Sequence, residues 1–102
     1  MSKELKILQS EEYQGEDWWK WAVWLEGNAE ALDHVEFVEW TLHPSFRDPI
    51  RTTRNRSDKF RLETGGWGVF IIHARVGIKD GSSLRLHHSL RLHYPSGEEN
   101  TA

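Results

Sequence analysis

Apolar and polar residues alternate along much of this chain, which is the pattern of β-strands that bury one face. The longest alternating run covers residues 69–78, and others cover residues 19–25, 35–42 and 84–94. We expect these runs to direct the following side chains into one core: Trp19, Trp21, Val23, Leu25, Val38, Trp40, Leu42, Phe70, Ile72, Ala74, Val76, Ile78, Leu84, Leu86, His88, Leu90 and Leu92.

The remaining segments predict shorter elements and the turns between them. Val35 and Phe37 are expected on the face of their strand opposite to Val38. The polar residues 11–17 predict a loop, and residues 28–32 have room for one helical turn. Shorter strands are expected at residues 5–8, 50–53 and 60–62.

Short strands with almost no helix predict an all-β fold, a sandwich of antiparallel strands. The chain has 102 residues, 37% of them hydrophobic and 28% charged, which fits one globular domain. We expect that single domain to cover residues 1–94. The polar residues 95–102 are expected to form a disordered tail.

The composition excludes several classes of function. The chain has no cysteine, which rules out disulfides, thiolate metal sites and cysteine nucleophiles. Its net charge of −3 argues against a dedicated nucleic-acid binder and is compatible with a basic peptide partner. No apolar run resembles a signal peptide or approaches the roughly 18 residues of a membrane span, so neither is expected.

Two segments look like loops that each carry one large aromatic residue, at residues 42–46 and 65–70. If both loops lie at the same end of the sandwich, Phe46 and Trp67 can form a slot with two flat walls. On burial alone, aromatics in such positions are more often core residues than slot walls. Glycines at positions 65, 66 and 68 favour the slot, because they allow positive φ angles and the close approach of a ligand.

Polar groups beside these aromatics suggest which ligand the slot takes. Ser45 places a hydroxyl next to Phe46, and His43 is positioned to orient that hydroxyl. A backbone N–H near Trp67 can supply a second hydrogen bond. Two flat walls with two hydrogen-bonding groups suit a secondary amide that carries a flat acyl tail.

The chain resembles the YEATS domain, a family of acyl-lysine readers with an immunoglobulin-like fold. The resemblance covers residues 18–94 and is most specific where a Leu-His loop is followed by a Gly-Trp-Gly loop. The matching segments, in order, are Trp21-Ala22-Val23-Trp24-Leu25-Glu26-Gly27, Val38-Glu39-Trp40-Thr41-Leu42-His43-Pro44-Ser45-Phe46, Pro49-Ile50-Arg51, Gly66-Trp67-Gly68-Val69-Phe70 and Leu90-Arg91-Leu92-His93.

The resemblance implies a role for each matching residue. His43 would support the pocket, and the Ser45 hydroxyl would bond the acyl carbonyl. Phe46 and Trp67 would be the two walls, with the Trp67 backbone N–H also bonding the acyl amide. Phe70 would line or support the channel. Gly66 and Gly68 would frame the Trp67 loop, and flat acyl groups such as acetyl or crotonyl would stack in an open-ended channel.

Three features depart from the family pattern. Val69 stands where many members have an acidic residue. The aromatic residue of the first loop has no clean match, since Asp17 stands near its place and Trp18 and Trp19 are the candidates. Nuclear members usually belong to larger chains with helical tails, whereas this sequence has only residues 95–102 after the expected domain. We therefore expect a stand-alone prokaryotic YEATS-like protein, cytoplasmic, or nuclear if the host is eukaryotic.

Other functions compete with an acyl-lysine reader. A sandwich whose edges or aromatic loops dock a protein, without acyl recognition, is the first alternative. A zinc site built from strand histidines is another, although such a site needs three converging ligands. A Ser45–His43 catalytic pair lacks an evident third group. We expect no enzymatic activity, no cofactor and no metal. The histidines considered are His73, His87, His88 and His93.

Overall fold

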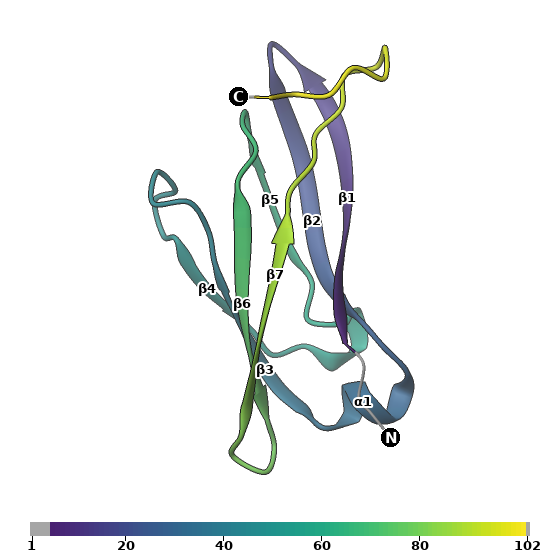
Figure 1. Ribbon diagram of the computed structural model, residues 1–102, viewed down its shortest axis with the longest axis vertical. Coiled ribbons are helices and arrows are strands. Elements are labelled where there is room, and N and C mark those ends of the chain that lie inside the picture. Colours follow the sequence, from purple (N-terminus) through teal and green to yellow (C-terminus); the bar gives the residue numbers. More distant parts are fainter. Residues whose placement is uncertain (1–4, 102) are drawn as a thin grey trace.

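The computed structural model describes residues 5–101, which form two antiparallel sheets packed face to face (Figure 1). The smaller sheet has the strand order β1–β2–β5 and the larger has the order β4–β3–β6–β7. The predicted all-β sandwich is therefore confirmed. The strands are β1 (Lys6–Gly15), β2 (Trp18–Glu26), β3 (Val35–Thr41), β4 (Ile50–Thr53), β5 (Leu62–Gly66), β6 (Ile71–Ile78) and β7 (Ser83–Ser89).

Two short helices connect the sheets away from the predicted slot. The helix α1 (Ala29–Asp33) carries the chain from β2 to β3 and lies at the lower end of the view in Figure 1. The Asn28 side chain caps it by accepting a hydrogen bond from the Ala31 N–H, which confirms the predicted helical turn. The 3₁₀ helix η1 (Arg56–Asp58) joins β4 to β5 and is tied to α1 by an ion pair between Arg56 and Asp33.

The core lies between the sheets and consists mainly of the side chains that the alternation predicts. Trp19, Val23 and Leu25 of β2 are fully buried, as are Val38 and Trp40 of β3. The inward residues of β6 from Ile72 to Ile78 are buried as well. The period of two along each strand therefore predicts these buried positions correctly.

Two positions differ from the predicted faces. Val35 is only 2% exposed, because the register of β3 against β6 shifts between Val35 and Phe37 and turns Val35 toward the core. Leu84 is 40% exposed and lies near the start of β7, an edge strand of the larger sheet. Alternation within one strand reveals neither a bulge nor the place of the strand in its sheet.

The strand β1 continues through most of the segment that was predicted to be a loop. It pairs with β2 as far as Gly15, and the hairpin closes through Glu16 and Asp17, whose φ angles are 54° and 58°. The polar residues of β1 hid this strand, because some of them point inward at the sandwich edge. There Gln9 and Glu11 bond the segment after β7 instead of joining the apolar core.

Residues 95–101 also differ from the predicted disordered tail. The chain turns at Gly97 and runs back, with a bridge between His93 and Glu99. The Asn100 N–H then donates to the carbonyl of Leu92 at 2.8 Å. These contacts lie between the tail and the domain, and they are invisible to a reading based on local polarity. Residue 102 lies outside the described residues.

Candidate functional site

The two predicted loops meet at one end of the sandwich. The β3–β4 loop is closed at its base by a hydrogen bond from the Leu42 N–H to the Pro49 carbonyl at 2.7 Å. Within it, the Phe46 N–H donates to the His43 carbonyl and forms a tight turn. The β5–β6 loop, residues 67–70, leaves the other sheet at the same end. Between the loops lies a cavity of about 370 Å³.

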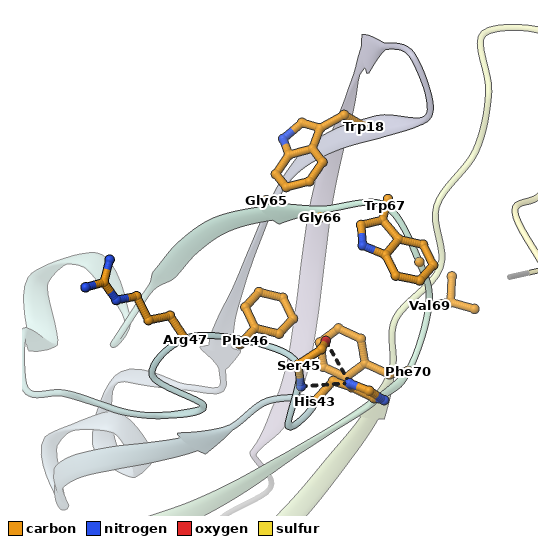
Figure 2. A pocket seen from close by; sticks show the side chains of 11 residues that line it. Trp18, His43, Ser45, Phe46, Arg47, Gly65, Gly66, Trp67, Val69 and Phe70 are labelled. Atoms are coloured by element: carbon orange, nitrogen blue, oxygen red, sulfur yellow. Dashed lines mark hydrogen bonds between the residues drawn. The ribbon is translucent and has the colours of Figure 1, made fainter.

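The cavity brings together nearly every residue that the sequence singled out (Figure 2). Trp19 is the exception: it is fully buried, and its indole N–H donates to the His93 carbonyl at 2.8 Å. Neighbouring side chains of a strand point to opposite faces, so Trp18 lines the cavity while Trp19 packs in the core. The lining residues are Trp18, His43, Ser45, Phe46, Arg47, Gly65, Gly66, Trp67, Gly68, Val69 and Phe70.

Arg47 and Val69 line the cavity although the sequence gave neither a binding role, and Gly65, which the sequence placed beside the slot without a binding role, lines it too. Each of them is next in sequence to a predicted site residue, so their position in the same two loops is the signal that could have identified them. Figure 2 shows the Arg47 side chain extending away from the aromatic rings. Arg47 therefore supplies positive charge at the rim of the cavity rather than inside it.

His43 and Ser45 form a small hydrogen-bonded unit at the cavity. The His43 Nδ1 lies 3.1 Å from the Ser45 backbone nitrogen and 2.8 Å from Ser45 Oγ. A backbone N–H can only donate, so Nδ1 accepts and carries no hydrogen in this arrangement. The Ser45 hydroxyl must therefore donate to Nδ1. Its oxygen lone pairs are then left to accept a hydrogen bond from a ligand.

Aromatic rings form the inner side of the cavity. Phe46 and Phe70 are in contact, with ring centroids 5.5 Å apart, and both contact Trp21 in the core below. The Phe70 ring also meets the His43 imidazole at 6.0 Å. Phe46 thus lines the cavity and also packs against the core. The sequence had suggested these two roles as alternatives, and this side chain has both.

Trp67 is 61% exposed and is therefore no core residue. Trp18 is 46% exposed, and Figure 2 shows both indoles beside the same space as Phe46. Exposed tryptophans at a concave site are typical of ligand-binding surfaces, because their large flat faces gain contact area on binding. The backbone of the β5–β6 loop therefore holds the Trp67 side chain at the cavity, without support from packing in the core.

The C-terminal segment supports the Trp67 loop. The Asn100 side-chain amide donates to the Trp67 carbonyl at 2.8 Å, and Asn100 is only 7% exposed. The tail reaches this position past Tyr94, whose hydroxyl donates to Asp17 Oδ1 at 2.7 Å; this hydrogen bond raises the pKa of Tyr94 to about 12. A residue from the predicted disordered tail is therefore part of the site's support.

Gly65 acts through close approach rather than through a positive φ angle. None of Gly65, Gly66 and Gly68 has a positive φ, which corrects the expectation from the sequence. A Cβ on Gly65 would lie 2.9 Å from the Trp19 carbonyl oxygen and 3.0 Å from Trp18 Nε1. The Trp18 indole can cover this point of β5 only because Gly65 has no side chain.

A comparison with protein families identifies the fold family. The chain matches the prokaryotic YEATS domain over residues 19–91. The chain belongs to the prokaryotic YEATS family. The resemblance inferred from the two loop motifs is thereby confirmed. A search of curated proteins found no match.

Solved structures of the YEATS protein Yaf9 share the fold of this YEATS domain. The Yaf9 YEATS domain bound to H3K27ac is 18% identical, with a TM-score of 0.71 over 98% of this chain and 82% of the other. The Yaf9 YEATS domain recognising an H3K122suc peptide is 22% identical, with a TM-score of 0.65 over 87% and 69%. Yeast Yaf9, an AF-9 homologue, is 20% identical, with a TM-score of 0.67 over 88% and 66%.

The histidines proposed for a zinc site are not assembled in this YEATS domain. His73 and His87 are cross-strand neighbours with ring centroids 6.5 Å apart. His88 faces the other way and contacts Gln9 Oε1, and His93 contacts a carboxylate oxygen of Glu11. Within residues 5–101, no three such side chains are close enough to hold a metal ion. Nor does any helix in that range have the length and hydropathy to cross a membrane.

Proposed function

We propose that this YEATS domain is a non-enzymatic binding module for acylated lysine, such as acetyl- or crotonyl-lysine on a peptide or protein. One observation carries the proposal: both loop motifs line one aromatic cavity that offers a hydroxyl but no carboxylate. The acyl-lysine peptides bound by Yaf9 support the same kind of ligand. The residues proposed to bind it are Trp18, His43, Ser45, Phe46, Gly66, Trp67, Gly68 and Phe70.

The acyl amide is recognised by two hydrogen bonds of opposite direction. Because the Ser45 hydroxyl donates to His43, its oxygen accepts from the amide N–H of the ligand. The Trp67 backbone N–H donates to the acyl carbonyl. This assignment differs from the one implied by the family resemblance, in which Ser45 bonds the carbonyl. Phe46 and Trp67 then flank the acyl tail as the two walls.

The lining residues also explain why unmodified lysine is rejected. An ammonium group that enters the cavity loses its hydration and meets no carboxylate among the lining residues, and the charged lining side chain, Arg47, is itself positive and lies at the rim. Burying an unpaired charge is far more costly than burying an amide whose hydrogen bonds are satisfied. The cavity therefore favours the neutral, acylated form.

The proposal is tested by titrating the protein with acetyl-lysine, crotonyl-lysine and unmodified lysine peptides. Binding is followed by tryptophan fluorescence and by proton–nitrogen NMR. We expect saturable binding of the acylated peptides only, with shifts confined to residues 43–46 and 65–70. Ser45→Ala should weaken binding by about fivefold, since a net hydrogen bond is worth about 1 kcal/mol.

Trp67→Ala and a matched tryptophan variant separate the slot from the rest of the surface. Trp67→Ala should abolish binding and leave the thermal midpoint nearly unchanged, because the side chain is 61% exposed. Trp24→Ala is the control, since Trp24 lies outside the cavity, where its ring stacks against the Arg61 guanidinium. Equal loss of binding in both variants, or unfolding of Trp67→Ala, would contradict the slot assignment.

The alternative function is a protein-interaction domain without acyl recognition. The exposed indoles of Trp18 and Trp67 are the observation that favours it. In that case a protein partner would bind with the same affinity whether or not its lysines are acylated. No response to any acylated peptide, together with such a partner, would replace the reader by this second function.

A further inference from the structure

One buried polar atom in this domain has no hydrogen-bond partner within the protein. It is Trp21 Nε1, and no other buried side-chain nitrogen or oxygen within residues 5–101 lacks a partner. The other buried indoles are satisfied: Trp19 Nε1 donates to the His93 carbonyl, and Trp40 Nε1 donates to Thr53 Oγ1 at 3.0 Å. Buried donors in folded proteins are nearly always paired, so an exception calls for an explanation.

The unpaired donor lies directly behind the slot. The Trp21 ring contacts two cavity-lining rings, with centroids 6.2 Å from Phe46 and 5.9 Å from Phe70. A Cβ on Gly66 would lie 3.7 Å from Trp21 Nε1 and 3.7 Å from Phe46 Cζ, with no other heavy atom beyond its chain neighbours within 4 Å. Because Gly66 has no Cβ, space for one further atom lies between the slot and the indole N–H.

We propose that the slot selects acyl groups that carry a neutral hydrogen-bond acceptor at their far end, and that this acceptor bonds the indole N–H of Trp21. The inference rests on the proposed function, since it concerns the inner end of the same slot. The amide is held near Ser45 and Trp67, and the acyl tail then points past Phe46 and Gly66 toward Trp21. An acceptor that settles into the gap beside Gly66 satisfies the unpaired donor.

The acceptor is neutral because of what surrounds it. The atoms within 4 Å of a Cβ on Gly66 are Phe46 Cζ and Trp21 Nε1, so the gap meets neither a charged group nor a second donor side chain. A carboxylate there would lose its hydration in exchange for one hydrogen bond from an uncharged indole, which is a net loss. A hydroxyl or ketone oxygen loses much less hydration, so one hydrogen bond is sufficient. A plain alkyl end fits but leaves the donor unpaired.

The test compares two acyl-lysine peptides of equal length and nearly equal shape. One carries a butanoyl group with a terminal hydroxyl, and the other carries a pentanoyl group, which has a methyl in place of that hydroxyl. The wild-type protein should bind the hydroxyl peptide more tightly than the pentanoyl peptide. Trp21→Phe keeps an aromatic ring and removes the donor. It should weaken the hydroxyl peptide about fivefold and change the pentanoyl peptide less than twofold.

A spectroscopic measurement on the wild-type protein keeps the test independent of that variant's folding. The Trp21 indole proton should move downfield when the hydroxyl peptide binds and should not do so with the pentanoyl peptide. The indole protons of Trp19 and Trp40 are internal controls, because both already have acceptors. Their signals should stay in place with either peptide.

The possible results separate this inference from the proposed function. Tight binding of the pentanoyl peptide, with weaker binding of the hydroxyl peptide and a stationary Trp21 signal, would overturn the inference and leave the acyl-lysine reader intact. Failure of both peptides, and of the acetyl and crotonyl peptides, would overturn the reader and the inference together. A hydroxyl preference that persists unchanged in Trp21→Phe would also overturn the inference.

Discussion

The support that Asn100 gives to the Trp67 loop leads to a quantitative prediction. Asn100→Ala removes the hydrogen bond from the side-chain amide to the Trp67 carbonyl, which spans 33 positions of sequence. The substitution leaves the backbone bond from Asn100 to the Leu92 carbonyl in place. It therefore tests the side-chain contacts of Asn100, including this hydrogen bond to the Trp67 loop, without removing the backbone bond that holds the tail.

The size of the effect follows from the burial of Asn100, which is 7% exposed. A net hydrogen bond between neutral groups contributes about 1 kcal/mol, and the cost rises toward about 3 kcal/mol if the carbonyl stays unpaired and buried. A loss of about 1 kcal/mol lowers the thermal midpoint of a domain of this size by about 4–8 °C. If the same loss of about 1 kcal/mol shifts the Trp67 loop out of its binding conformation, the affinity for the ligand falls in proportion to the population that remains. This loss of affinity is up to about fivefold.

Two measurements on the Asn100→Ala variant check this reasoning. Urea unfolding followed by circular dichroism gives the change in stability, and titration with the crotonyl-lysine peptide gives the change in affinity. Asn55→Ala is the matched control: it removes the Asn55 cap of η1, at the α1 end of the sandwich, and should cost stability without changing affinity. An unchanged stability and affinity in Asn100→Ala would refute the role of the tail.

Three further predictions concern stability alone, measured by the denaturation midpoint. Gly77→Ala should lower the free energy of unfolding by about 1–3 kcal/mol, because the new methyl group would overlap the Phe37 ring. If the same substitution destabilises a Phe37→Ala variant equally, the overlap with this ring is not the cause. Burial, and secondly the charge of Arg91, lower the pKa of His88 below its usual 6.5 in the folded protein. The unfolded chain therefore binds a proton at His88 more readily than the folded protein does, and the free energy of unfolding falls as the pH drops below 6.5. His88→Gln should reduce that loss of stability between pH 7 and pH 5, and a pH profile identical to that of the wild type would contradict this assignment. Glu16→Asn should raise the free energy of unfolding by up to about 1 kcal/mol, because asparagine adopts the left-handed φ of 54° in this hairpin turn at a lower cost than glutamate. A lower denaturation midpoint in Glu16→Asn would show that this backbone conformation does not strain Glu16.

Local pattern was enough to predict much of the fold and most of the candidate site. The inward faces of β2, β3 and β6 follow from a period of two, since neighbouring side chains of a strand point to opposite sides. The two loops that line the cavity are continuous segments of a few residues, so their motif can be recognised without knowing the fold. This is why Ser45, Phe46 and Trp67 could be singled out from the sequence.

What the sequence by itself did not determine depends on contacts between distant segments. The second half of β1, residues 9–15, is hidden in the sequence because its inward polar residues bond the segment after β7, about 80 positions away. The choice of Trp18 over Trp19 as the cavity residue needed the strand's orientation against the second sheet.

Asn100 and Trp21 show the same limit at the site itself. Asn100 reaches the Trp67 loop only because the chain folds back after Tyr94. The unpaired N–H of Trp21 is a property of the packed core, since any tryptophan in an unfolded chain has water as its acceptor. Local patterns in the sequence thus specify most of the buried faces and the two loops that line the candidate site. Tertiary packing decided which groups support that site and which donor is left without a partner.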